Sequence, residues 1–180
     1  MQLQRRNKAG YTLVEVLIVV SIMGILSSMG VAGLRSAIAN ARVKDAALNT
    51  TAFLERMANE SRRMSADLCM VRDPGLANKL LVYQSDGSEN CHGTLISSFV
   101  VESPNKFVNL KDCGLVTTDW LGNTPVFFTP RRGLSAAPLE GAICIQYGGE
   151  ELYGAAHKIK SSNSIIPKWK IGKNSSWTDL

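Results

Sequence analysis

The sequence is poor in the groups on which most enzymes and metal sites depend. It has only two histidines, His92 and His157, and none of its four cysteines forms a CxxC pair. No GxSxG, HExxH, P-loop or GxGxxG pattern occurs, so nucleophilic, zinc-dependent and nucleotide-dependent catalysis have no motif to support them. We therefore expect a protein that is not an enzyme and that uses no metal and no cofactor.

Proline and charge are also absent over long stretches. Residues 16–73 contain no proline, and residues 16–34 are nineteen consecutive uncharged positions. A helix of that length, rising about 1.5 Å per residue, nearly crosses a hydrocarbon core of about 30 Å. Residues 35–64 contain neither proline nor glycine and are rich in helix formers, which predicts that the membrane helix continues without a break.

The second half of this predicted helix is amphipathic. Its apolar side chains recur at helical spacing between charged ones, which predicts a stripe that packs on a sheet. The members of the stripe are Leu34, Ile38, Ala41, Leu48, Ala52, Phe53, Met57 and Met64.

The start of the apolar run differs from a secretory signal. Three basic residues, Arg5, Arg6 and Lys8, precede a small Ala-Gly pair that comes before the run and not after it. A lone carboxylate, Glu15, lies in the first turns of the run. A short basic leader that ends in Gly10 and is followed by Tyr-Thr-Leu-Val-Glu and an apolar helix resembles a type IV prepilin.

The resemblance implies how the chain is processed. Residues 1–10 would be a leader peptide, and a prepilin peptidase would cleave between Gly10 and Tyr11 and then N-methylate Tyr11. The family more often has Phe or Met at this first mature position. The apolar helix would stay on the mature protein.

Glu15 has two interpretations. An ionised carboxylate at membrane depth costs several kcal/mol unless it is paired, and the new amino group of Tyr11 on a neighbouring subunit would be a suitable counter-ion. That pair would set the axial register of one helix against the next during assembly, and the resemblance favours this role. The alternative is a carboxylate at the membrane interface that faces water and complements the helix dipole.

Beyond residue 64 the pattern changes to short apolar runs separated by turns, which predicts an antiparallel β domain over residues 65–180. Gly148 and Gly149 predict a hairpin between two of these runs. The expected fold is α+β and pilin-like, with a membrane helix over residues 11–34, its amphipathic continuation over 35–64, and the β domain resting on that continuation. The predicted strands are 67–72, 79–84, 94–102, 106–110, 126–129, 142–147, 151–153 and 164–171.

All four cysteines lie outside the apolar run. In a domain that is carried across a membrane, Cys69, Cys91, Cys113 and Cys144 predict two disulfides, with three pairings open. A metal site is the weaker alternative, because the two histidines form no ligand cluster.

The last 25 residues carry five lysines against one acid, interleaved with Trp169 and Trp177. Such a mixture could bind nucleic acid through phosphates and stacking. Lysines also protect an exposed β edge against aggregation, and we favour that interpretation. The five candidate nucleic-acid contacts are Lys158, Lys160, Lys168, Lys170 and Lys173.

Taken together, these features predict a structural subunit of a type IV pilus or of a type II secretion filament. The lack of a helix-breaking proline, and a weak similarity of residues 54–71 to the helix-to-strand segment of minor pseudopilins and DNA-uptake pilins, favour a minor pilin or pseudopilin. Expected partners are other subunits, the prepilin peptidase and an inner-membrane assembly platform. The chain would cross the bacterial inner membrane once, with its C-terminal domain in the periplasm, before it enters the filament. A membrane-anchored envelope binding protein that never polymerises, and a DNA-uptake pilin that uses the basic tail, are the alternatives.

Overall fold

A computed structural model describes residues 11–85, 91, 93–115, 117–122, 125–134, 140–159 and 164–180. The predicted leader, His92 and Lys160 therefore lie outside the described residues. The chain divides into two compact units, residues 1–38 and residues 39–180. We describe each unit by itself.

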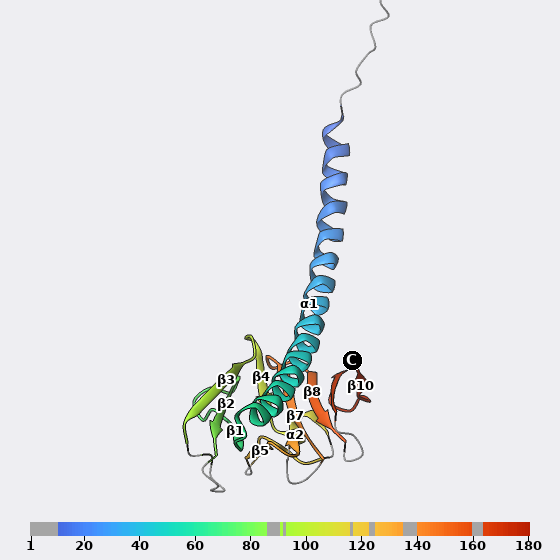
Figure 1. Ribbon diagram of the computed structural model, residues 1–180. Coiled ribbons are helices and arrows are strands. Elements are labelled where there is room, and N and C mark those ends of the chain that lie inside the picture. The colour runs from blue at the N-terminus through green and yellow to red at the C-terminus, as the bar shows by residue number, and fades with distance from the viewer. Residues whose placement is uncertain are drawn as a thin grey trace, which may run out of the picture. The chain divides into compact units, whose positions relative to one another are not determined.

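One helix dominates the first third of the chain, as the sequence predicts. Helix α1 (Leu13–Met64) is 52 residues long (Figure 1). It ends where Ser65 adopts a left-handed conformation with φ of 50°. The Ser65 N–H then donates to the Arg62 carbonyl at 3.2 Å, and the Ala66 N–H donates to the Ser61 carbonyl at 3.2 Å. These two bonds form a Schellman motif, which satisfies carbonyls that the end of a helix would otherwise leave unpaired.

The described residues beyond α1 form two sheets and one short helix, and their strands pair antiparallel. The first sheet has the order β3-β2-β1-β5-β6 and the second has the order β10-β9-β8-β7-β4 (Figure 1). The fold is thus α+β, as the sequence predicts. The elements are β1 (Leu68–Arg72), β2 (Lys79–Gln84), β3 (Leu95–Val100), β4 (Asn105–Val108), α2 (Leu110–Cys113), β5 (Val126–Thr129), β6 (Gly133–Leu134), β7 (Gly141–Tyr147), β8 (Leu152–Lys158), β9 (Ile165–Ile171) and β10 (Thr178–Asp179).

The predicted strands match these elements with three differences. The run at 106–110 is split, because β4 ends at Val108 and α2 begins at Leu110. The run predicted at 151–153 extends to Lys158, since β8 pairs along its whole length with both β7 and β9. Strands β6 and β10 were not predicted, because a strand of two residues is too short to show an alternation of apolar and polar side chains.

The main core joins the C-terminal part of α1 to both sheets. Leu54 and Met57 of α1 lie in one cluster with Leu80 of the first sheet and Ile143 of the second. The other face of the second sheet has a core of its own, which includes Cys113 and Leu110 of α2. The second sheet is therefore buried on both faces, and its strands β7 and β8 each begin with five buried residues.

The predicted stripe on α1 was partly wrong. Phe53 and Met57 are buried, but Leu34, Ile38, Ala41, Leu48 and Ala52 are exposed. The observed face contains hydroxyl residues, which the apolar pattern could not reveal. Thr50 donates to the Ala46 carbonyl at 2.7 Å, so its hydroxyl is satisfied inside the core. The buried residues of α1 are Ala39, Val43, Ala46, Ala47, Thr50, Thr51, Phe53, Leu54, Met57 and Ser61.

Helix α1 approaches β8 closely at Gly154. A Cβ atom built on Gly154 would lie 2.9 Å from the Val43 carbonyl oxygen and 3.1 Å from the Ala47 Cβ. Only a residue without a side chain fits this gap without a shift of the helix backbone. Gly154 thereby sets the distance between the helix and the second sheet.

Candidate functional site

The start of α1 is built as a capping box. The Thr12 backbone N–H donates to Glu15 Oε2 at 3.1 Å, and the Glu15 backbone N–H donates to Thr12 Oγ1 at 3.2 Å. The Thr12 hydroxyl also donates to the same carboxylate oxygen at 3.3 Å. Thr-x-x-Glu is the sequence signature of this motif, so the cap was a local signal that could have been found in the sequence. Glu15 therefore caps its own helix.

The capping box uses only one of the two carboxylate oxygens of Glu15. Both contacts to the carboxylate go to Oε2, and no hydrogen bond from a described residue reaches Oε1. Glu15 and the neighbouring Tyr11 are exposed, Tyr11 by 88%. A cation from outside the chain could thus bind Oε1 while Oε2 keeps the cap.

The apolar run that follows is exposed and is not covered by any described residue of its own unit. Its large apolar side chains from Leu13 to Leu34 are each 49% to 82% exposed. Its hydroxyls are satisfied inside the helix, since Ser21 Oγ donates to the Leu17 carbonyl at 2.8 Å and Ser28 Oγ donates to the Ile25 carbonyl at 2.7 Å. By length and composition, α1 is the one helix among the described residues that could cross a membrane. Such an exposed apolar surface requires lipid or other protein around it.

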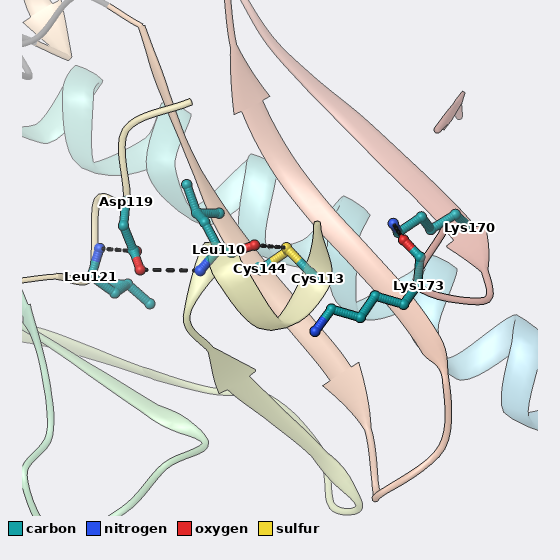
Figure 2. Close-up of a disulfide and its surroundings, with 7 residues drawn as sticks. All are labelled: Leu110, Cys113, Asp119, Leu121, Cys144, Lys170 and Lys173. Atoms are coloured by element: carbon teal, nitrogen blue, oxygen red, sulfur yellow. Dashed lines mark hydrogen bonds between the residues drawn. A yellow bond between two sulfur atoms is a disulfide. The ribbon is translucent and has the colours of Figure 1, made fainter. Parts of the chain in front are cut away.

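The four cysteines form two disulfides, as the sequence predicts, and the structure gives their pairing. Cys69 pairs with Cys91, and Cys113 pairs with Cys144. The first bridge ties β1 to the segment before β3, and the second ties α2 to β7 (Figure 2). Cys113 and Cys144 are both fully buried.

The second bridge lies in a region organised by Asp119. Figure 2 shows Asp119 between two backbone amides: its Oδ2 accepts from the Leu110 N–H at 3.2 Å, and its Oδ1 accepts from the Leu121 N–H at 3.0 Å. The first bond holds the start of α2. Helix α2 ends at Gly114, whose φ of 62° is left-handed. Asp119 and Gly114 thus position Cys113 for its partner on β7.

The described lysines of the basic tail are largely occupied inside the domain. Lys158 is buried and its Nζ donates to the Leu134 carbonyl at 3.0 Å. Lys168 forms a salt bridge with Asp179 at 3.0 Å, which joins β9 to β10. Lys173 is exposed. Burial lowers the pKa of the Lys158 amine.

Lys170 has the most enclosed position of these lysines and is only 3% exposed. Its Nζ donates to the Lys173 carbonyl (Figure 2), and it lies 5.0 Å from the Trp177 ring centre and 5.6 Å from the Tyr153 ring centre. Burial, and secondly the charge of Lys173, lower the pKa of its amine. The amine therefore holds the C-terminal segment on the second sheet.

The remaining titratable groups offer no reaction centre among the described residues. No group of three or more His, Cys, Asp or Glu side chains there could hold a metal ion. His157 lies on β8, and burial, followed by the charge of Lys168, lowers the pKa of its imidazole. Its Nδ1 is buried and has no hydrogen-bond partner among the described residues.

Comparison with known proteins identifies one motif. Residues 5–31 match the family described as the prokaryotic N-terminal methylation motif. No curated protein matches the chain. The chain is also similar to a solved structure, that of the minor pseudopilin EpsH from the type 2 secretion system of Vibrio cholerae. The sequence identity is 8% and the TM-score is 0.37, and the match covers 77% of this chain and 96% of that one. The N-terminal region of this chain therefore carries a prokaryotic N-terminal methylation motif, at the place where the sequence resembles a prepilin.

Proposed function

We propose that the chain is a structural subunit, a minor pilin or pseudopilin, of a type IV pilus or a type II secretion filament. The observation that carries this proposal is the exposed apolar run of α1, whose first turn contains the Thr12–Glu15 capping box. The cap alone would serve any membrane helix, but the methylation motif over residues 5–31 and the carboxylate oxygen Oε1, which no described residue binds, favour an assembling helix. Assembly needs no cofactor and no catalytic residue of this chain.

The proposed maturation removes residues 1–10 by cleavage between Gly10 and Tyr11 and methylates the new N-terminus at Tyr11. The mature chain then lies in the inner membrane as a single span, with residues 39–180 in the periplasm. Prepilin peptidase and an assembly platform are its partners at this stage, and other pilin or pseudopilin subunits are its partners in the filament.

Glu15 supplies the register of assembly in this proposal. Its Oε2 caps the helix, while its Oε1 accepts a hydrogen bond from the amino group of Tyr11 on a neighbouring subunit. A charged residue at membrane depth is costly when it has no partner, so pairing favours the subunit arrangement that brings the two groups together. Apolar contacts between neighbouring runs then replace contacts with lipid.

Two substitutions separate the counter-ion role from the cap. Glu15→Gln keeps a capping side chain at the third helical position but removes the charge, whereas Thr12→Ala removes the cap and keeps the charge. We expect the Gln variant to be processed but absent from purified filaments, and the Ala variant to be incorporated. Intact and N-terminal peptide mass spectrometry measures processing, and filament fractionation measures incorporation.

The same measurements decide against the proposal if it is wrong. A chain that keeps residues 1–10, or that is cut after the apolar run, would leave an anchored or secreted β domain. A correctly processed wild-type chain that never enters filaments would favour the non-polymerising envelope binding protein. Equal incorporation of Glu15→Gln and wild type would remove the counter-ion role alone.

A further inference from the structure

The two sheets have four edges, and three of them are short or covered. Strands β6 and β10 have two residues each. Strand β4 is covered, because the Phe107 N–H donates to the Ala77 carbonyl at 2.8 Å. Proteins usually protect edge strands with short length, charge, proline or a covering segment, because an open edge pairs with other chains.

Within the described part of the chain, strand β3 is protected by no charge, proline or covering segment, and its pairing with β2 shifts register only near its start, opposite Val82 and Tyr83. It is the outermost strand of the first sheet, beyond β2 (Figure 1), and is six residues long. Its sequence, Leu-Ile-Ser-Ser-Phe-Val, contains no charge and no proline. Leu95 and Val100 are each 52% exposed.

The register of β3 shows which backbone groups are free. The Val101 N–H donates to the Asn78 carbonyl at 3.0 Å, and Lys79 lies opposite Val100, so residues 78 and 101 form a hydrogen-bonded pair. Hydrogen-bonded and non-hydrogen-bonded pairs alternate in an antiparallel ladder. The backbone N–H and C=O groups of Ser98 and Val100 therefore point away from β2, toward the open edge.

A groove of about 380 Å³ lies beside this edge, between α1 and the helix-facing side of β3. Phe53 and Phe99 stack in its wall with ring centres 4.7 Å apart and an interplanar angle of 15°. The exposed Ala52 leaves room beside them. The helix side is a single stripe at spacings of three and four, formed by Arg42, Asp45, Asn49, Ala52 and Arg56.

The wall also contains a polar atom that lacks a partner. Asn105 is 4% exposed, and its Oδ1 accepts no hydrogen bond from the described residues. Arg42 and Arg56 are exposed and form no salt bridge with a described residue. The groove thus combines apolar side chains with polar groups that have no partner among the described residues, a combination found in ligand-binding clefts.

We propose that β3 binds an extended strand of another polypeptide, uncharged and with an apolar side chain at every second residue, which continues the first sheet. Its backbone would bond to Ser98 and Val100, and its alternate side chains would enter the groove over Phe53 and Phe99. A helical partner could not use the free backbone groups, because its own are already paired. Because the groove is lined by two basic and two acidic residues, and β3 itself is uncharged, the surface favours no net charge on the strand. This interaction surface is additional to assembly through α1.

A defined peptide tests the proposal on the full-length chain in detergent micelles. The probe is a fluorescein-labelled, end-blocked hexapeptide that alternates Val with Thr and is N-methylated at every second amide, so that one edge can pair and self-stacking is blocked. The control has the same side chains but is N-methylated at every amide. We expect saturable fluorescence anisotropy with the probe, at least tenfold weaker binding of the control, and no binding to empty micelles.

Two pairs of variants locate the site. Ser98→Pro removes an outward N–H at an edge position that tolerates proline, and Ser98→Ala removes only the hydroxyl. We expect roughly tenfold weaker probe binding for the first and an unchanged Kd for the second. Ala52→Trp fills the groove from an exposed helix position and should abolish binding, whereas Leu48→Trp, exposed outside the groove, should not.

Thermal unfolding of each variant shows that it is folded, and the peptide comparison and Ala52→Trp keep the test decisive if Ser98→Pro unfolds. Absence of saturable binding overturns the proposal. Equal binding of the two peptides overturns it as well, because the backbone ladder would then play no part. Binding that survives both Ser98→Pro and Ala52→Trp would place the peptide on another surface and equally overturn it.

Discussion

A methyl group at Gly154 tests how tightly α1 is packed against the second sheet. A Cβ atom there would lie 2.9 Å from a backbone oxygen, that of Val43, and 3.1 Å from the Ala47 methyl group. Neither neighbour is the flexible end of a long side chain, so Gly154→Ala must move the helix or the strand. Insertion of extra atoms into a well-packed core costs about 1–3 kcal/mol.

Gly154→Ala is therefore expected to lower the free energy of unfolding by about 2 kcal/mol. For a chain of this size, that corresponds to a fall of roughly 4–8 °C in Tm. The measurement is thermal unfolding of the full-length chain in detergent, followed by circular dichroism. The disulfides are kept intact, so that only packing changes between variants.

Gly149→Ala is the matched control. A Cβ on Gly149 has no atom within 4 Å, and its φ is not in the left-handed region. Both substitutions reduce the freedom of the unfolded chain equally, so their difference isolates the contact with α1. If Gly154→Ala unfolds within about 1 °C of Gly149→Ala, the helix is not held at this distance and the reasoning fails.

Three further predictions follow from the β unit. Titration with dithiothreitol, followed by mass mapping, should open Cys69–Cys91 before Cys113–Cys144, because Cys91 is partly exposed while both partners of the second bridge are fully buried. The first bridge joins residues 22 apart in the sequence and the second joins residues 31 apart. Loss of either should lower the free energy of unfolding by about 3–4 kcal/mol, measured by thermal unfolding. Burial lowers the folded-state pKa of His157, so the unfolded chain binds its proton more readily below about pH 6.5 and stability should fall as pH falls from 7.5 to 5.5. His157→Gln should flatten that slope in Tm against pH, and an unchanged slope would assign it to other groups. Lys44 Nζ lies 3.7 Å from the Trp169 ring centre, so Lys44→Met should cost about 0.5–1 kcal/mol in the wild-type background and nothing beside Trp169→Leu.

The long helix was predictable because composition decides it. A run without proline, rich in helix formers, has one favourable secondary structure, and Thr12 and Glu15 mark its start in the sequence itself. Its buried face was not predictable. Ser61 is polar but fully buried, and its hydroxyl is satisfied because it donates to the Ala66 carbonyl at 2.7 Å. Hydroxyl groups that bond to nearby carbonyls hide the periodicity on which a stripe depends.

The contacts between distant residues at the candidate site could not be predicted from the sequence. Helix α2 has four residues, too few for a periodic pattern, and it is held by Asp119, nine residues beyond its first residue. The tail lysines have a basic composition in the sequence, but the carbonyl of Leu134 and the ring of Trp177 decide which of them meet solvent. Such partners come from elsewhere in the chain, and local pattern does not specify them.

The order of the disulfides has a consequence for how the domain matures. The first cysteine along the chain is bonded to the second and the third to the fourth, Cys69 to Cys91 and Cys113 to Cys144. Of the three ways to pair four cysteines, this is the one in which a chain delivered N-terminus first meets each correct partner before a wrong one arrives. Oxidation during export would then yield the native bridges directly, without reshuffling by an isomerase.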